Sequence, residues 1–454
     1  MIGAVAKTGQ GEPPEEARHS WAVIVRLSWP LVLTMLANAG VGLLDTWIAG
    51  FFGAEAQAVV GLSMQLVLLI NATTTAISVG AQALVARFVG ARDAEQAALA
   101  SRQALLLGAG LSLAVIPVVW LAAPALFAAM GAGAELQASG AAYLRALLWG
   151  ILPMDLLIVM SAILRARALT RVSLVGSLAE TGVWATFSLL LGWLNGWGLA
   201  GLVAGFVAGK LAGFGVLAYF FWKMELLQMA QSRWQIQIAW FRRIMRTGLP
   251  AGFQVVIRNA GMMAFFAILA MLPQPTQLVA AVSIGFRIES VAFLPVFALN
   301  IAAATLVGQS LGAGRPEEAQ RAVWRIVWLG TAILSAFGLI FLVGADWLAA
   351  RFTHDPLVRG HAVDYLRIMA ISEPFLAVAM VLNGALQGAG DAKAPMWGVI
   401  IFQIGVRVPL AFLLAVVCGI GSLGAWWAMT ISMVAQAAGM VWYFRRGHWR
   451  ERTV

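Results

Sequence analysis

Eight ionisable side chains lie inside long apolar stretches of this chain, where a charge is costly. They are five acids and three bases: Asp45, Asp155, Glu180, Glu289 and Glu373, with Arg258, Arg287 and Arg407. If these stretches cross a membrane, each charged side chain costs at least about 2.5–3.5 kcal/mol at the bilayer centre. Each of the eight therefore needs a partner, a water-filled cavity or a function such as carrying a proton or an ion.

Asp45 is the strongest candidate for proton chemistry. It lies between Leu44 and Thr46 near the end of the first apolar stretch, with no lysine or arginine within one helical turn. Apolar surroundings favour the neutral form of a carboxyl group, so Asp45 could bind and release a proton near neutral pH. The alternative is a structural carboxylate, hydrogen-bonded to Asn38 and Thr34 one or two turns away.

Two further acids in the first half of the chain are ranked below Asp45. Glu180 could support Asp45, or it could be a structural carboxylate in contact with Lys210, whose long stem could also reach a membrane interface. Asp155 lies in the middle of the fourth apolar stretch and has no evident partner.

The second half holds a network of opposite charges. We expect Arg258 to pair with Glu289 and Glu373 to pair with Arg407, because the members of each pair lie on adjacent stretches at similar depth. Arg287 and Glu289 are two residues apart and do not face each other on a helix. The alternative is that these pairs only stabilise the second half.

Aromatic and methionine side chains near these charges could contact a substrate. Trp47 and Trp184 could bind a cation through their ring faces. Met35, Met64 and Met262 could provide adaptable apolar lining. Most of the 19 tryptophans are better explained as belts at the membrane interfaces.

The elements that position these residues are membrane-spanning helices. The chain is 61% hydrophobic and 11% charged, whereas soluble domains carry about 25% charged residues. Continuous apolar stretches of about 20 residues predict helices. Twelve can be placed, at 21–51, 55–86, 95–121, 138–164, 170–193, 197–222, 243–272, 277–308, 319–344, 360–387, 394–418 and 421–444.

The two halves of the chain repeat each other. Residues 85–97 return as 307–319, an offset of 222 residues, and the motif at 143–145 returns at 365–367. Prolines match as well, Pro30 with Pro250 and Pro153 with Pro374. Matched prolines in both halves favour hinges, although static kinks would also explain them.

These boundaries predict five regions and one orientation. They are a disordered cytoplasmic tail (1–20), an N-lobe (21–222), a cytoplasmic linker (223–242), a C-lobe (243–444) and a basic cytoplasmic tail (445–454). Lysine and arginine collect in alternate loops, including those with Arg87, Arg165 and Arg315, while the ninth loop departs from this pattern. The positive-inside rule then places both termini in the cytoplasm.

Several glycine-rich motifs make a family resemblance specific. They are Gly285–Ser290, Val307–Gly314 and Gly384–Asp391, together with Asp45-Thr46 and Gly53-Ala54-Glu55. The chain resembles the MATE (multidrug and toxic-compound extrusion) transporters from about Trp21 to Phe444. The resemblance implies twelve helices in two six-helix lobes. It also implies export of organic, often cationic, amphiphiles in exchange for H⁺ or Na⁺.

Within that family the resemblance favours a proton-coupled branch. An aspartate at position 45 matches the proton-binding position of DinF-like members. The sodium-linked NorM-like members carry acids where this chain has Arg258 and, by count, Leu376. The chain is therefore expected to be a proton-coupled antiporter, with Na⁺ as the alternative coupling ion and no other cofactor or metal.

Other functional classes were weighed against this one. A lipid-linked saccharide flippase of the wider superfamily is the second interpretation. Such proteins often have fourteen spans and a basic central cavity, so twelve stretches and an acidic first helix argue against it. The four histidines lie outside the stretches and no nucleotide loop is present, which argues against a membrane enzyme; a channel is harder to exclude. We expect a monomer in the inner membrane that contacts lipid and small organic substrates and binds no nucleic acid.

Overall fold

Helices form nearly all of the described chain, which in this computed structural model comprises residues 21–227 and 235–452. The predicted tail 1–20, part of the predicted linker and the last two residues lie outside the described residues. The first half contains α2 (Trp21–Phe51), α3 (Ala54–Gly90), α4 (Ala94–Ala129), α5 (Ala134–Leu147), α6 (Ile151–Ala166), α7 (Thr170–Phe187) and α8 (Leu199–Lys223). The second half contains α9 (Ile238–Leu269), α10 (Pro275–Gly312), α11 (Pro316–Ala350), α12 (Pro356–Gly388), α13 (Lys393–Gly398), α14 (Arg407–Phe412) and α15 (Ser422–Arg446).

Short segments of other helix types join some of these elements. Two of them are 3₁₀ turns, η2 (Leu148–Gly150) and η6 (His448–Glu451). Three are π-helical, η3 (Ser188–Leu194), η4 (Val399–Val406) and η5 (Leu413–Val417). The η3 and η5 segments lie near the ends of corresponding helices in the two halves.

Eleven continuous helical segments of the described chain are long and apolar enough to cross a membrane. One of them is Ala134–Ala166, which joins α5, η2 and α6, and another is Lys393–Val417, which joins α13 to η5. The twelfth, α15, has 25 residues, but its Ser, Thr and Gln residues make it less apolar. The predicted all-helical membrane fold, with six crossing segments in each half, is confirmed.

Local sequence explains where many helices begin. Asp93 and Asp355 cap α4 and α12 by accepting hydrogen bonds from free backbone N–H groups of the first turn. Prolines open α10, α11 and α12, where a missing N–H costs nothing. Before α8 and α15, Gly198 (φ 56°) and Gly421 (φ 68°) adopt left-handed backbone angles at matching repeat positions.

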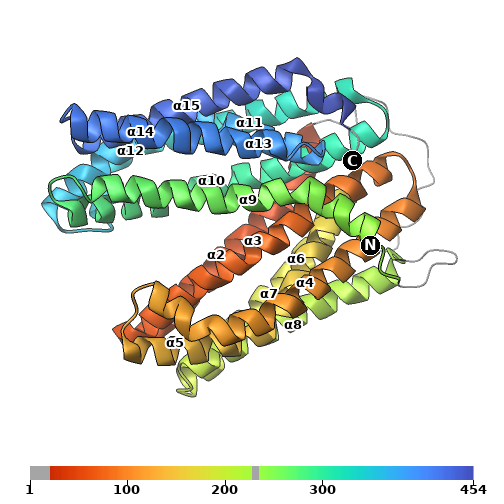
Figure 1. Ribbon diagram of the computed structural model, residues 1–454, viewed down its shortest axis with the longest axis horizontal. Coiled ribbons are helices and arrows are strands. Elements are labelled where there is room, and N and C mark those ends of the chain that lie inside the picture. Colours follow the sequence, from red (N-terminus) through yellow and green to blue (C-terminus); the bar gives the residue numbers. More distant parts are fainter. Residues whose placement is uncertain (1–20, 228–234, 453–454) are drawn as a thin grey trace.

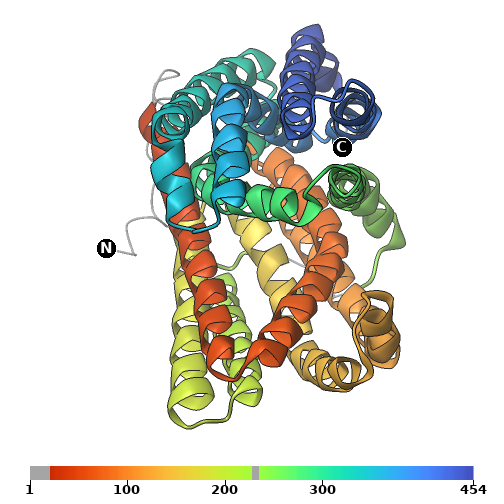
Figure 2. The same ribbon diagram turned by 90° about the vertical axis from the view of Figure 1, so that its left-hand side faces the viewer.

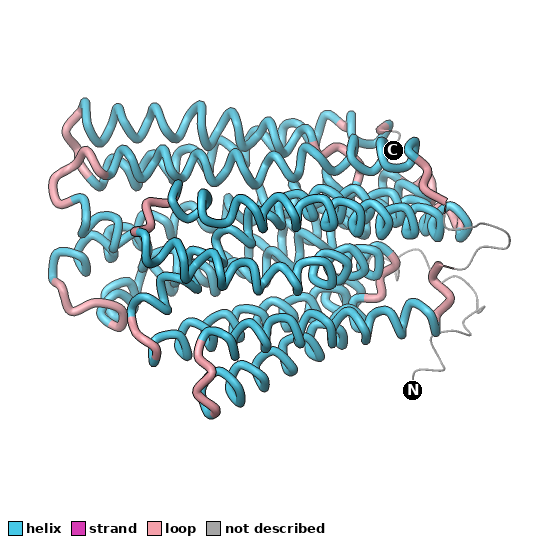
Figure 3. The backbone as a smooth tube through the Cα atoms, turned by 60° about the horizontal axis from the view of Figure 1, so that its bottom comes forward, coloured by secondary structure: helices cyan, strands magenta, loops and turns pink. Residues whose placement is uncertain are grey.

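The helices form two groups, the N-lobe (α2–α8) and the C-lobe (α9–α15) (Figure 1). Figure 2 views the two groups from the left-hand side of Figure 1. Loops are confined to the two ends of the helices (Figure 3). Buried residues form one large core cluster in the C-lobe, which Ile24 and Leu27 of α2 join, and two clusters in the N-lobe, one of which Trp240 and Ile244 of α9 join.

The lobes touch at the end of the molecule where the N and C labels lie and diverge toward the other end (Figure 1). At the touching end, glycines allow backbones to meet. A Cβ on Gly248 of α9 would overlap the carbonyl oxygen of Ala76 in α3, and a Cβ on Gly312 of α10 would overlap that of Arg87.

Hydrogen bonds close the same end. Gln82 Nε2 donates to Thr305 Oγ1 (3.3 Å), and Gln309 Nε2 donates to the carbonyl oxygen of Ala166 (2.8 Å). Together with the glycine contacts, these bonds hold the two lobes against each other at this end.

Candidate functional site

Asp45 is buried in the N-lobe and bonded to another helix. Its side chain on α2 is 2% exposed, and its Oδ2 accepts a hydrogen bond of 2.9 Å from Trp184 Nε1 on α7. The other oxygen, Oδ1, is buried and makes no hydrogen bond of normal geometry with the described residues, although the Ser188 side chain lies beside the carboxylate. A buried carboxylate oxygen with spare acceptor capacity is a place where a proton can bind.

An ion pair lies against the face of the Trp184 ring. Lys210 of α8 binds Glu180 of α7, and both side chains are buried. The Lys210 ammonium lies 4.9 Å from the Trp184 ring centroid and 5.2 Å from that of Phe206, which adds cation–π attraction. The predicted contact between Glu180 and Lys210 is confirmed, and Lys210 does not extend to an interface.

These residues form what we call the Asp45 cluster: Asp45, Trp184, Lys210 and Glu180. It links α2, α7 and α8 and carries two acids and one base. Trp184 donates a hydrogen bond to Asp45 and also contacts the Lys210 ammonium through its ring face. A change of charge on Asp45 therefore alters the hydrogen bond of a ring that contacts Lys210.

The predicted supporting residues of Asp45 lie elsewhere. Thr34 Oγ1 donates to the Pro30 carbonyl oxygen (3.0 Å), and Asn38 Nδ2 donates to the Thr34 carbonyl oxygen (2.9 Å) and to Ser177 Oγ (3.3 Å). The alternative in which Thr34 and Asn38 bond Asp45 is not observed, because both side chains form hydrogen bonds within α2 and with Ser177 of α7 instead.

The other predicted contacts of the N-lobe are dispersed. Trp47 is 51% exposed and packs against Phe51 and Trp193 at ring-centroid distances of 4.7 and 5.7 Å. Met35 and Met64 are half-buried. A substrate contact by these three residues stays a prediction, and none of them lines a cavity described below.

Asp155 is held by hydroxyl groups. Thr74 Oγ1 of α3 donates to its Oδ1 (2.7 Å), and Ser112 Oγ of α4 donates to its Oδ2 (2.5 Å). The carboxylate therefore has two partners that charge patterning did not reveal. Its bonds connect α3, α4 and α6, which is the arrangement of a structural carboxylate.

A cavity of about 510 Å³ lies inside the C-lobe and gathers four of the predicted charges. Arg258, Glu289, Glu373 and Arg407 all line it, but the pairs we expected do not form among the described residues. Glu289 instead accepts a hydrogen bond from Tyr365 Oη (3.2 Å), and Arg407 Nε donates to Ser432 Oγ (3.0 Å). The pairs were expected because the residues lie at similar depth in the membrane. Depth does not determine the direction in which each side chain points from its helix.

The remaining predicted charge of the C-lobe, Arg287, is exposed and does not line this cavity. The rest of the wall mixes amide and hydroxyl side chains with adaptable apolar ones, which include two phenylalanines and several methionines, among them the predicted Met262. Flexible thioethers and aromatic rings suit variable apolar shapes. The C-lobe cavity thus combines two carboxylates and two arginines with amide groups and adaptable apolar side chains.

A second cavity, of about 380 Å³, lies on the seam between the lobes. It is lined by α3, α9, α10 and α12, by Arg165 at the end of α6, and by several amide side chains. Among its described lining residues, the charged ones are Arg165 and Arg258, and no acid is present. Gln254, Arg258 and Asn383 line both cavities, so the two meet there.

The matched prolines lie where the repeat placed them. Pro30, Pro250 and Pro374 are inside α2, α9 and α12, and Pro153 is in the first turn of α6, directly after the 3₁₀ turn η2. Their action as hinges stays a prediction.

Comparison with known proteins identifies the family. The MatE family model matches residues 30–190 and 250–413, most of both lobes. The chain belongs to the MATE family. Members of this family are transporters, not enzymes.

Curated MATE relatives align over nearly the whole chain. A probable multidrug resistance protein NorM from Thermotoga maritima is 25% identical over 451 residues, which are 97% of this chain and 96% of the relative. A protein of the same description from Pseudomonas aeruginosa is 29% identical over 437 residues, 93% and 88% of the two chains.

Solved MATE structures share the fold. One, described as the outward-facing conformation of a multidrug resistance MATE family transporter of the MOP superfamily, superposes with a TM-score of 0.90 at 21% identity and covers 98% of this chain and 100% of its own. A crystal structure of MATE in the bent conformation gives 0.89 at 21% identity, with 96% and 98% covered.

Some residues of this MATE chain that carry the site were not predicted. Arg165 was counted as a loop residue, although it lines the seam cavity. Thr74, Ser112 and Tyr365 bond buried acids. Hydroxyl groups in the middle of apolar stretches were the available indication, because a buried hydroxyl needs a partner.

Proposed function

We propose that this MATE transporter is a secondary active antiporter that exports amphiphilic organic compounds in exchange for protons. Family membership and the description of its relatives as multidrug resistance proteins support export of such compounds. The assignment to a DinF-like, proton-coupled branch depends on Asp45, since the relatives compared carry the NorM description.

The observation that carries the proton assignment is the environment of Asp45. An ionisable residue buried in a membrane protein is by default a candidate for function. Here one oxygen is bonded to Trp184, and the other makes no hydrogen bond of normal geometry although Ser188 lies beside it, so a proton can be added without breaking the bond to Trp184.

Protonation of Asp45 would act on the packing of the N-lobe. It neutralises the acceptor of the Trp184 hydrogen bond and weakens that bond, because charge-assisted bonds are roughly twice as strong as neutral ones. The Trp184 ring also contacts Lys210. One proton therefore changes the contacts among α2, α7 and α8, and protonated and deprotonated forms would favour different lobe arrangements.

The substrate site we infer is the C-lobe cavity. The cationic end of an amphiphile would lie near Glu289 and Glu373, and its apolar body would lie along the methionine and phenylalanine wall. A substrate from the cytoplasm would reach this site past the seam cavity, which meets the C-lobe cavity at Gln254, Arg258 and Asn383, and would leave at the end where the lobes diverge.

Sodium coupling is the second candidate. The specific observation in its favour is that Glu289 and Glu373 share a cavity with the amide side chains of Gln254 and Gln403, which supply further oxygen atoms. Hard cations bind carboxylate and amide oxygens. In this alternative the coupling ion would enter the C-lobe and Asp45 would have only a structural role.

Transport in proteoliposomes under an imposed proton gradient, and then under a sodium gradient, tests the proposal. Asp45→Asn retains an oxygen that can accept the Trp184 hydrogen bond but cannot carry a proton. We expect this variant to fold and to lose transport driven by the proton gradient.

Asp155→Asn is the matched control, because it makes the same change at a buried carboxylate of the same lobe. It should retain proton-driven transport. Proton-driven transport by Asp45→Asn at the wild-type rate would refute the coupling role. Transport driven by sodium and abolished by Glu289→Gln would favour the alternative.

A further inference from the structure

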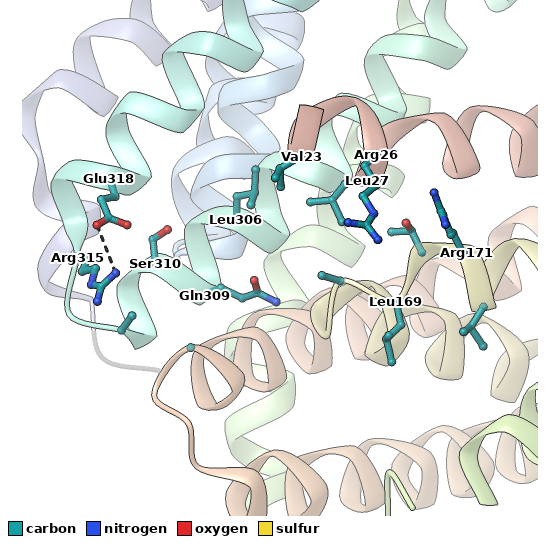
Figure 4. Close-up of a pocket in the computed structure, with 15 residues that line it drawn as sticks. Val23, Arg26, Leu27, Leu169, Arg171, Leu306, Gln309, Ser310, Arg315 and Glu318 are labelled. Carbon is teal, nitrogen blue, oxygen red and sulfur yellow. Dashed lines mark ion pairs between the residues drawn. The ribbon is translucent and has the colours of Figure 1, made fainter. Parts of the chain in front are cut away.

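A third cavity, of about 490 Å³, opens between the lobes at the end where they touch. Its walls come from the start of α2, the turn between α6 and α7, the first turn of α7, and the turn between α10 and α11 (Figure 4). None of its lining residues belongs to the Asp45 cluster or to the C-lobe cavity. Because both lobes line it, a molecule that fills it contacts both lobes at once.

One end of this cavity is basic. Arg26 of α2 and Arg171 of α7 lie at that end, whereas Arg315 and Glu318 form an ion pair of 3.5 Å at the other (Figure 4). Arg26 and Arg171 are exposed and form no ion pair with the described residues. The Arg171 guanidinium lies 5.9 Å from the ring centroid of Trp29. Two cations without anionic partners thus lie at the basic end.

The rest of the wall is largely apolar. Val23, Leu27, Leu169, Val172 and Leu306 line the cavity between its two charged ends. A free phosphate ion would use only the basic end, and a hydrocarbon alone would use only the wall. The cavity therefore fits an amphiphile with an anionic head.

The cavity also lies at the level where phospholipid headgroups occur. Trp21 and Trp29, at the start of α2, are 50% and 40% exposed, and exposed tryptophans at helix ends mark the boundary between bilayer and water. Basic side chains at this boundary attract acidic lipids.

We propose that this cavity binds an acidic phospholipid, with the phosphate between Arg26 and Arg171 and the first part of an acyl chain along Leu27 and Leu169. A lipid bound there joins α2 and α7 to α10. At the wall of the cavity, Gln309 donates to the Ala166 carbonyl oxygen across the seam (2.8 Å). Opening this end would separate the walls, so the lipid favours the arrangement in which the lobes touch here.

Thermal unfolding of the purified full-length protein in detergent tests this site without any measurement of transport. Tryptophan fluorescence follows unfolding during titration with phosphatidylglycerol, with phosphatidylcholine of the same acyl chains, and with glycerol phosphate. A ligand that binds the folded state raises the midpoint of unfolding. We expect phosphatidylglycerol to raise it and the other two to leave it nearly unchanged.

Two variants with the same loss of charge locate the binding. Arg26→Gln/Arg171→Gln removes the basic end of the cavity. Arg445→Gln/Arg446→Gln removes two exposed arginines that instead contact Trp324 and Trp442. The cavity variant should bind phosphatidylglycerol about thirtyfold more weakly than the wild type, and the control less than about threefold more weakly.

Three results would overturn the proposal. The first is an equal loss in the two variants, which would indicate general surface attraction. The second is equal stabilisation by phosphatidylcholine, which would remove the requirement for an acidic headgroup. The third is equal stabilisation by glycerol phosphate, which would assign the cavity to a soluble phosphate ester.

Discussion

A single methyl group at the seam should shift the balance between lobe arrangements. The Cβ added by Gly248→Ala would overlap the carbonyl oxygen of Ala76 and lie 2.8 Å from the amide nitrogen of Gly80. Relaxed contacts between such atoms are about 3.5 Å, so relief of the overlap with the Ala76 oxygen requires α9 and α3 to separate by roughly 2 Å. Overpacking of this kind costs about 1–3 kcal/mol.

That cost applies only while the lobes touch at this end. In an arrangement where α9 and α3 are apart, the added methyl group meets no backbone. The equilibrium should therefore move away from the arrangement described here by about 5–150-fold. Gly40→Ala is the matched control, because a Cβ on Gly40 of α2 has no atom within 4 Å and the gain in helix propensity is the same.

Spin labels at the opposite end can measure this shift. Cysteines at Ala134 of the N-lobe and Leu357 of the C-lobe, both exposed, would carry the labels after Cys418→Ser. In the wild type and in Gly40→Ala we expect a long distance between the labels, and in Gly248→Ala a larger short-distance population. A wild-type distribution in Gly248→Ala would show that the seam yields to the methyl group, and the reasoning would fail.

Three other expectations can be checked directly. Trp184→Phe keeps an aromatic face for Lys210 but removes the N–H that donates to Asp45. The protein should lose about 1–3 kcal/mol of stability, and an unchanged unfolding midpoint would contradict the role of the hydrogen bond. Thr74→Val should destabilise the folded protein by a similar amount, because Asp155 loses a donor. Adding Asp155→Leu should recover part of the loss, because the unsatisfied acid is then removed. Further destabilisation by the second change would count against this account. The single cysteine, Cys418, is exposed and should react with an impermeant thiol reagent on intact cells. A cysteine at Ala313 in a Cys418→Ser background should react only in opened membranes. The reverse pattern would contradict the predicted orientation.

The membrane-spanning helices could be predicted because the bilayer requires a long apolar helix at each crossing. A bilayer requires continuous apolar stretches, and the predicted stretch 21–51 coincides with α2 (Trp21–Phe51). The repeat then organised the stretches into two sets. The π-helical segments were not predictable, because an extra residue in a helical turn leaves the apolar pattern of Ser188–Leu194 unchanged.

The partners of buried charges could be predicted only in part. Glu180 and Lys210 were paired correctly because few cations lie in the N-lobe stretches. The sequence indicates a substrate contact for Trp184, whereas in the structure its indole N–H donates to Asp45, 139 residues away in the chain. Arg258 and Glu289 were placed at similar depth, but depth does not give the rotation of a helix about its own axis.

The shared wall between the C-lobe and seam cavities has a consequence for the rate and direction of transport. A cation that moves between the two cavities passes Arg258, which lines both of them. At a distance of about 5 Å and an effective dielectric constant of about 20, the repulsion is about 3 kcal/mol. Arg258 therefore acts as an electrostatic barrier between the two compartments, which slows a monovalent cation at this point and gives a zwitterion, whose negative end the arginine attracts, the easier passage.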